Sequence, residues 1–131
     1  MFFILENKSL EKTAIVKKTI KYSLTENYEF GRVYKRGTSY GGKYVVIYIL
    51  KKRNKIFRLG ITATKKIGKA VVRNRARRLI YENMRLLAPD LKVGYDIVVV
   101  ARTNMVGADF SAVGAEIKRL LNKADMFAGR A

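Results

Sequence analysis

Positive charge and helical spacing coincide in the stretch KKIGKAVVRNRARRLIYENMR, residues 65–85, which holds eight Lys and Arg side chains and one Glu. Placed at about 100° per residue, positions 69–87 put most apolar side chains on one arc and the arginines on the rest. A planar guanidinium can hold a phosphate through two hydrogen bonds, whereas a lysine acts as a point charge. The stretch therefore predicts a helix over 69–87 that packs on one side and binds a polyanion on the other.

The predicted helix has a buried arc and a cationic arc. The buried arc consists of Val72, Ala76, Leu79, Ile80, Leu86 and Leu87. The cationic arc carries Arg73, Asn74, Arg75, Arg77, Arg78 and Arg85. Asn83 falls inside the apolar arc, where the pattern gives it no role. A solvated helix face normally carries acidic partners at i±4, whereas this helix holds one acid, so an ordinary charged surface is the weaker interpretation.

Two further features indicate phosphate and RNA. Lys65 and Lys66 come just before the predicted helix N-terminus, where free backbone N–H groups and the positive end of the dipole already attract phosphate. Asn74 stands between two arginines and adds a neutral donor and acceptor, which suits a base edge, a 2′-hydroxyl or a metal-bound water. The predicted ligand is therefore a nucleic acid.

The overall composition supports this interpretation. The 131-residue chain carries 28 Lys and Arg against 10 Asp and Glu, a net charge of +18, whose self-repulsion an anionic partner would screen. The chain has no Cys and no His, which excludes disulfides, thiolate or imidazole metal sites and imidazole acid–base chemistry. The opening MFFIL is apolar for only five residues, so we expect no secretory signal, no membrane contact and a cytoplasmic location.

The remaining elements predict one α+β domain over 23–131, preceded by an N-terminal extension, 1–22, without a sustained pattern. A first helix is expected from an N-cap at Thr25 to Gly37. The runs 43–50 and 56–64 read as an antiparallel hairpin joined by KKRNK, and 95–102 as a central strand apolar on both faces. A closing amphipathic helix follows a cap at Asp109.

The run KKIGKAVVRNRARR resembles the signature of the bacterial ribonuclease P protein family. The resemblance extends in order through 24–50, through RLGITATKKIGKAVVRNR and through GYDIVVVAR, about three quarters of the chain. It implies a two-layer α/β sandwich with a left-handed βαβ crossover, an exception to the usual right-handed rule, and makes 69–87 the crossover helix. It also implies that a catalytic RNA removes the 5′ leader of precursor tRNA, using Mg²⁺ bound by RNA and substrate.

In such an enzyme the protein would bind the catalytic RNA and the precursor tRNA as a 1:1 complex with the RNA, with no catalytic and no metal-binding residue of its own. The resemblance assigns RNA contacts to Lys65, Lys66, Lys69, Arg73, Asn74, Arg75, Arg77, Arg78 and Arg85. Family members commonly have a basic residue where this chain has Tyr81, so the far end of the cationic arc is expected to be shortened.

The resemblance further implies that the leader lies between the first helix and the sheet, against Phe30, Tyr34 and Tyr48. Phe30 and Tyr34 are four apart on a helix, so their rings can converge with Tyr48 and stack on unpaired bases. Core packing is the alternative explanation for each ring.

Two other functions stay open. A ribosomal or other structural RNA-binding protein would have the same charge, size and lack of catalytic groups. A stand-alone ribonuclease would need an acid–base pair, and the available acids Glu82, Asp96 and Asp109 are scattered over different elements.

Overall fold

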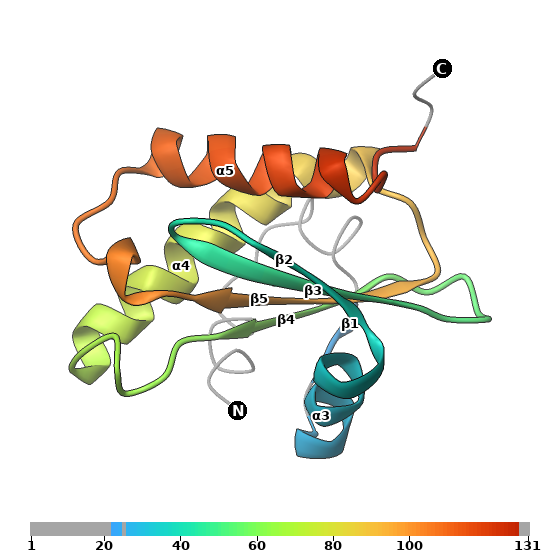
Figure 1. The fold of residues 1–131 in the computed structure, drawn as a ribbon, viewed down its shortest axis with the longest axis horizontal. Coiled ribbons are helices and arrows are strands. Elements are labelled where there is room, and N and C mark those ends of the chain that lie inside the picture. The colour runs from blue at the N-terminus through green and yellow to red at the C-terminus, as the bar shows by residue number, and fades with distance from the viewer. Residues whose placement is uncertain (1–21, 25, 129–131) are drawn as a thin grey trace.

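The computed structural model describes residues 22–24 and 26–128, which form a mixed sheet and three helices (Figure 1). The strands are β1 (Tyr22–Ser23), β2 (Thr38–Gly41), β3 (Val45–Lys51), β4 (Arg58–Thr62) and β5 (Tyr95–Ala101). The helices are α3 (Asn27–Arg36), α4 (Ala70–Leu87) and α5 (Phe110–Lys123), with 3₁₀ turns η1 (Ala88–Asp90) and η2 (Thr103–Met105). The predicted extension lies outside the described residues, except that Tyr22 already belongs to the sheet.

The strand order in the sheet is β1-β4-β5-β3-β2. Strand β5 is central, antiparallel to β3 and parallel to β4, so α4 is the crossover helix of a β4–α4–β5 unit. The predicted hairpin of 43–50 with 56–64 is wrong, because β5 lies between these two strands. The true hairpin partner of β3 is the short strand β2, which is mostly exposed and has no apolar alternation for a sequence pattern to detect.

Helices cover the two faces of this sheet unequally (Figure 1). Helices α4 and α5 lie together on one face and enclose the main core with the inward side chains of the strands, forming the two-layer sandwich. Helix α3 lies on the other face over a smaller cluster, Leu24, Phe30, Val33 and Val98. The prediction of a central strand covered from both sides is confirmed, since Ile97, Val98 and Val99 are all fully buried.

The helix predicted over 69–87 is confirmed as α4, but its buried side is rotated from the predicted one. At about 100° per residue, the buried positions of α4 are centred between Ile80 and Arg77. This centre lies roughly 75° around the helix from the centre of the predicted buried arc. This rotation leaves Leu86 57 % exposed and buries Arg77, against the prediction for both, and it also buries Tyr81. Tyr81 therefore faces the interior, and burial raises its pKa to about 12.

Asn83, which the sequence pattern gave no role, joins α4 to α5. Its Nδ2 donates hydrogen bonds to the carbonyl oxygens of Leu79 (3.0 Å) and Phe110 (3.3 Å). A Cβ added at Gly114 of α5 would lie 2.3 Å from Asn83 Oδ1, so the two helices approach closely where the glycine leaves room. The predicted cap of α5 is confirmed, with Asp109 Oδ1 accepting from the Ala112 N–H at 2.7 Å.

A buried carboxylate fixes the turn between β2 and β3. Glu116 of α5 accepts hydrogen bonds from the backbone N–H groups of Lys43, Tyr44 and Val45 at 2.7–2.9 Å. Any side chain at Gly42 would collide with the Glu116 carboxylate. This interaction sets the start of β3, which carries Tyr48 on the side of the sheet away from α5.

Candidate RNA interface

The first candidate surface is cationic and spans the turn before α4 and the exposed side of that helix. We call it the arginine face: Lys65, Lys66, Lys69, Arg73, Asn74, Arg75 and Arg78. All of these side chains are exposed except Arg73, which is half-buried. Within the described residues Lys65, Lys66, Lys69, Arg75 and Arg78 form no ion pair, so their charges are available to an outside anion.

A tight turn presents the lysines at the start of α4. The backbone N–H groups of Ile67 and Gly68 donate to the carbonyl oxygens of Thr64 and Lys65, and Ile67 is buried beneath the turn. Gly68 has φ +147°, a conformation that side-chain-bearing residues rarely adopt. Arg73 Nη1 donates to the Gly68 carbonyl at 3.0 Å, which couples the first arginine of the motif to this turn.

Two predicted RNA ligands are placed differently from the rest. Arg77 is only 3 % exposed and donates a hydrogen bond to Asn74 Oδ1, so its predicted position on the exposed arc is wrong. Its guanidinium instead orients Asn74, which is itself exposed. Arg85 is half-buried and pairs with Glu82 at 2.9 Å, so part of its charge is already compensated.

The second candidate surface is an aromatic patch made by Tyr34 of α3 and Tyr48 of β3. The two rings meet edge to face, with centroids 4.9 Å apart and planes at 75°. The Tyr34 hydroxyl lies 3.0 Å from Thr62 Oγ1 at the end of β4. Partial burial raises the pKa of Tyr34 above its already high ordinary value, and the protonated phenol can still hydrogen-bond. Tyr34 is 38 % exposed, which leaves ring surface for a stacking partner.

Phe30 does not belong to this patch, although it was predicted beside the two tyrosines. Its ring is 5 % exposed and packs in the small core beneath α3. A Cβ at Gly60 would lie 2.6 Å from the ring, so the glycine of β4 makes the space that Phe30 fills. The prediction that Phe30 lines the surface is therefore wrong, and the alternative of core packing holds for this ring.

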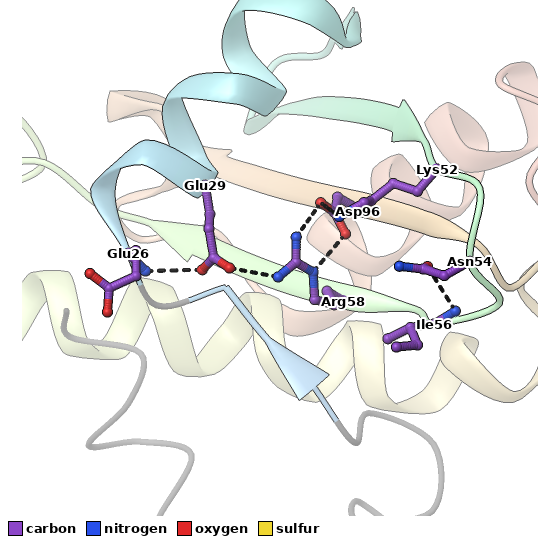
Figure 2. Close-up of polar contacts among 7 residues, drawn as sticks. All are labelled: Glu26, Glu29, Lys52, Asn54, Ile56, Arg58 and Asp96. Carbon is purple, nitrogen blue, oxygen red and sulfur yellow. Dashed lines mark hydrogen bonds and ion pairs between the residues drawn. The ribbon is translucent and has the colours of Figure 1, made fainter.

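Helix α3, which carries Tyr34, is fixed to the sheet by a buried network of charges (Figure 2). Arg58 of β4 donates to both carboxylate oxygens of Asp96 at 2.9 and 2.8 Å, and its third bond reaches Glu29 of α3 at 2.6 Å. Glu29 also accepts from the backbone N–H of Glu26, which is the N-cap of α3 where Thr25 was predicted. Lys52 approaches Asp96 at 3.5 Å, and the carboxylates raise the pKa of Arg58.

The sequence pattern did not reveal this network, because its members stand on three different elements. A weak signal existed, since Arg58 occupies the face of β4 opposite the predicted apolar stripe Phe57, Leu59, Ile61 and Ala63, all of which are buried. Asp96 interrupts an otherwise apolar strand in the same way. Two opposite charges on neighbouring buried strands indicate a pair, but only the strand order shows that they are adjacent.

The arginine face and the aromatic patch meet at the C-terminal end of β4. Thr62, which contacts Tyr34, precedes Lys65 by three residues, and the turn at 64–68 leads directly into α4. The cationic surface thus continues into the aromatic one. Such an arrangement suits RNA with a single-stranded end.

The acids that a ribonuclease would require are committed elsewhere. Asp96 is held by Arg58, Asp109 caps α5 and Glu82 pairs with Arg85. They lie on β5, at the start of α5 and on α4, so the geometry supports binding rather than acid–base catalysis by these residues. In the described part of the chain, no helix is long and apolar enough to cross a membrane.

The fold and its two surfaces define a basic α+β protein of the RNA-binding class. A sequence model of the Ribonuclease P family matches residues 19–125. The chain is 42 % identical over 106 residues to the ribonuclease P protein component of Thermoanaerobacter sp. (strain X514), covering 81 % of this chain and 91 % of the relative. It is 45 % identical over 104 residues to that of Clostridioides difficile (strain 630), covering 79 % and 91 %.

Comparison with solved structures indicates the same family. The RNase P protein of Staphylococcus aureus matches with a TM-score of 0.74 and 32 % identity over 81 % of this chain and 97 % of the other. That of Thermotoga maritima matches with a TM-score of 0.70 and 30 % identity over 77 % and 96 %. The chain belongs to the ribonuclease P protein family, which supports RNA binding, a part in tRNA processing and association with the RNase P RNA.

Proposed function

We propose that this chain binds the catalytic RNA of ribonuclease P through its arginine face and the 5′ leader of precursor tRNA at its aromatic patch. The observation that carries the proposal is the continuity of these two surfaces at the C-terminal end of β4. Cations that form no ion pair with described residues suit the phosphates of folded RNA, and the partly exposed rings of Tyr34 and Tyr48 next to them suit the unpaired bases upstream of the cleavage site.

In this proposal the protein positions the precursor tRNA and the catalytic RNA cleaves it. Arg75, Arg78 and the three lysines of the arginine face neutralise phosphates, while Asn74, oriented by Arg77, hydrogen-bonds without adding charge. Mg²⁺ is held by the RNA and the substrate, and no residue of this chain is assigned to it. We propose a 1:1 complex with the RNA in the cytoplasm.

Reconstitution tests the proposal. Precursor tRNA is incubated with the protein alone, with the RNase P RNA alone at low Mg²⁺, and with both. We expect cleavage at the mature 5′ end with both partners and none with the protein alone, because Glu82, Asp96 and Asp109 are held in structural interactions. Cleavage by the protein alone, or no stimulation of the RNA at any Mg²⁺ concentration, would overturn the proposed role.

A further inference from the structure

A second basic surface lies on α3 and the end of β3, away from the arginine face. It is an open groove with Leu50 as its apolar floor and five cationic side chains around it, and we call it the basic groove: Arg32, Arg36, Leu50, Lys51, Lys52 and Arg53. The groove includes the start of the KKRNK segment, whose charge exceeds what a surface turn requires. Neither the arginine face nor the aromatic patch makes use of these cations.

Most of the charge in the groove is uncompensated. Lys52 is engaged by Asp96, at 3.5 Å, and the Arg32 guanidinium lies 5.6 Å from the centre of the Tyr28 ring. Arg36, Lys51 and Arg53 are exposed and form no ion pair with any described residue. Placing three cations side by side without a carboxylate costs electrostatic free energy unless an anion binds between them.

The register of the sheet places the groove relative to the aromatic patch. On the face that α3 covers, Leu50 lies opposite Asp96 and Asp96 opposite Arg58, in one row across the sheet. Val46, Val100 and Thr62 form the corresponding row at the Tyr34 contact. The two rows are four residues apart along the strands, or about 13 Å at roughly 3.3 Å per residue.

Helix α3 lies between these rows. Its Phe30 fits against Gly60 of β4, and Gly37 at its end lies against the Ile49 backbone of β3, so the helix crosses the sheet over β5. Tyr34 extends from one flank of the helix, and Glu29 extends from the other toward Arg58. The groove lies on the second flank, so a strand leaving the aromatic patch reaches it by passing around α3, a helix about 10 Å wide.

Chemistry beside the groove suits unpaired RNA. Tyr28 is 65 % exposed and is held against Arg32, which gives a ring for a base next to cations for phosphates. Leu50 supplies an apolar floor, which the edge or face of a base can cover. Folded catalytic RNA is less well suited, because the arginine face, its proposed site, leads into the opposite end of the strands.

We propose that the basic groove holds phosphates of the precursor tRNA leader upstream of the nucleotides at the aromatic patch. This inference rests on the proposed leader site, and it extends that site around α3. It predicts that leader length decides affinity in two stages. A short leader reaches the tyrosines, and a longer one also reaches the groove.

The test uses the assembled holoenzyme and the double variant K51Q/R53Q, which keeps the side-chain stems and spares the paired Lys52. The matched control is K118Q/R119Q, which removes the same charge from exposed positions of α5 on the other face of the sheet. Affinity is measured between 50 and 200 mM salt for mature tRNA, for a short-leader substrate and for a long-leader substrate.

If the two replaced side chains each neutralise one single-stranded phosphate, the slope of log affinity against log salt should become shallower by about 1.4. Across a fourfold rise in salt, the variant should then lose about sevenfold less affinity than the wild type. We expect this reduction for K51Q/R53Q with the long leader only, and no such reduction for the control. An equal reduction of the slope with all three RNAs, an equal reduction in the control, or no reduction would overturn the proposal that the groove binds the leader. Alanine at Tyr48, run in parallel, distinguishes the outcomes, because its short-leader defect reports on the aromatic patch alone.

Discussion

Replacing Arg58 by Met should destabilise the protein by about 3 kcal/mol, because it leaves the buried Asp96 carboxylate without its main partner. Removing one member of a buried ion pair typically costs 3–5 kcal/mol. Asp96 is 1 % exposed and would be deprived of two hydrogen bonds of 2.9 and 2.8 Å, whereas Lys52 stays at 3.5 Å and compensates part of the charge. This residual pairing places the expected cost near the lower end of that range.

The functional consequence follows from Glu29, the third partner of Arg58. Without the 2.6 Å ion pair, α3 keeps its apolar packing through Phe30 and Val33 but is no longer held by charge to β4, which helps to fix Tyr34 in place. Domains of this size have stabilities of about 5–15 kcal/mol, so we expect the variant to fold. The holoenzyme should then bind leader-bearing substrate less tightly and mature tRNA almost as before.

The assay is urea denaturation of the free protein at a fixed anion concentration, since a net charge of +18 disfavours the compact state. The double variant R58M/D96N tests the cause, because removing both charges should recover much of the stability. Lys92→Met, which breaks an exposed pair with Asp125, is the matched control and should cost under about 1 kcal/mol. A cost for R58M no greater than this control, or no recovery in the double variant, would refute the reasoning.

Three further predictions concern the RNA surfaces and the helix seam. Arg75→Ala should flatten the dependence of log affinity for the catalytic RNA on log salt by about one unit for each phosphate that Arg75 neutralises, and an unchanged slope would place the RNA elsewhere. Tyr48→Ala should weaken binding of leader-bearing substrate by roughly 1–3 kcal/mol if a base stacks on the ring, with mature tRNA unaffected, and its thermal melt measured alongside separates an effect on stacking from an effect on packing. Gly114→Ala should destabilise the free protein by about 1–3 kcal/mol in urea, because the new methyl group meets Asn83 Oδ1, and adding Asn83→Ala should relieve part of that cost.

The helices were predictable because each carries its own pattern. The end of α3 at Gly37, the cap of α5 at Asp109 and the whole of α4 could be read from local spacing and end signals. The strand pairing could not, because alternation shows which face of a strand is buried and not which strand lies beside it. The insertion of β5 between β3 and β4 depends on the α4 crossover, a long-range feature without a local signal.

The site was predictable to the extent that it followed spacing on one element. Lys65, Lys66 and Arg75 are exposed as expected, whereas Arg77 is buried, because α4 packs against both α5 and the sheet and a helical wheel contains neither neighbour. Tyr34 and Tyr48 do converge, but Phe30 fills the space above Gly60. In this protein the glycine of the opposing strand makes Phe30 a core residue, and nothing in the sequence of α3 itself indicates that glycine.

The placement of charge suggests how the proposed function would divide the work between a protein that positions the substrate and an RNA that cleaves it. Residues 51–85 contain thirteen basic residues and one acid. The fold places most of the exposed cations among them in the arginine face and the basic groove, which lie at opposite ends of the central strands. The aromatic patch lies on the path between them, so a single-stranded leader that followed the charge would pass the tyrosines. Binding along the proposed path would fix the direction of the leader as well as its affinity, because the groove is reached only after α3 has been passed. On the proposed function, the protein would restrain the substrate on one side of the cleavage site, which would lower the entropic cost of positioning the scissile phosphate and leave the chemical step to the RNA.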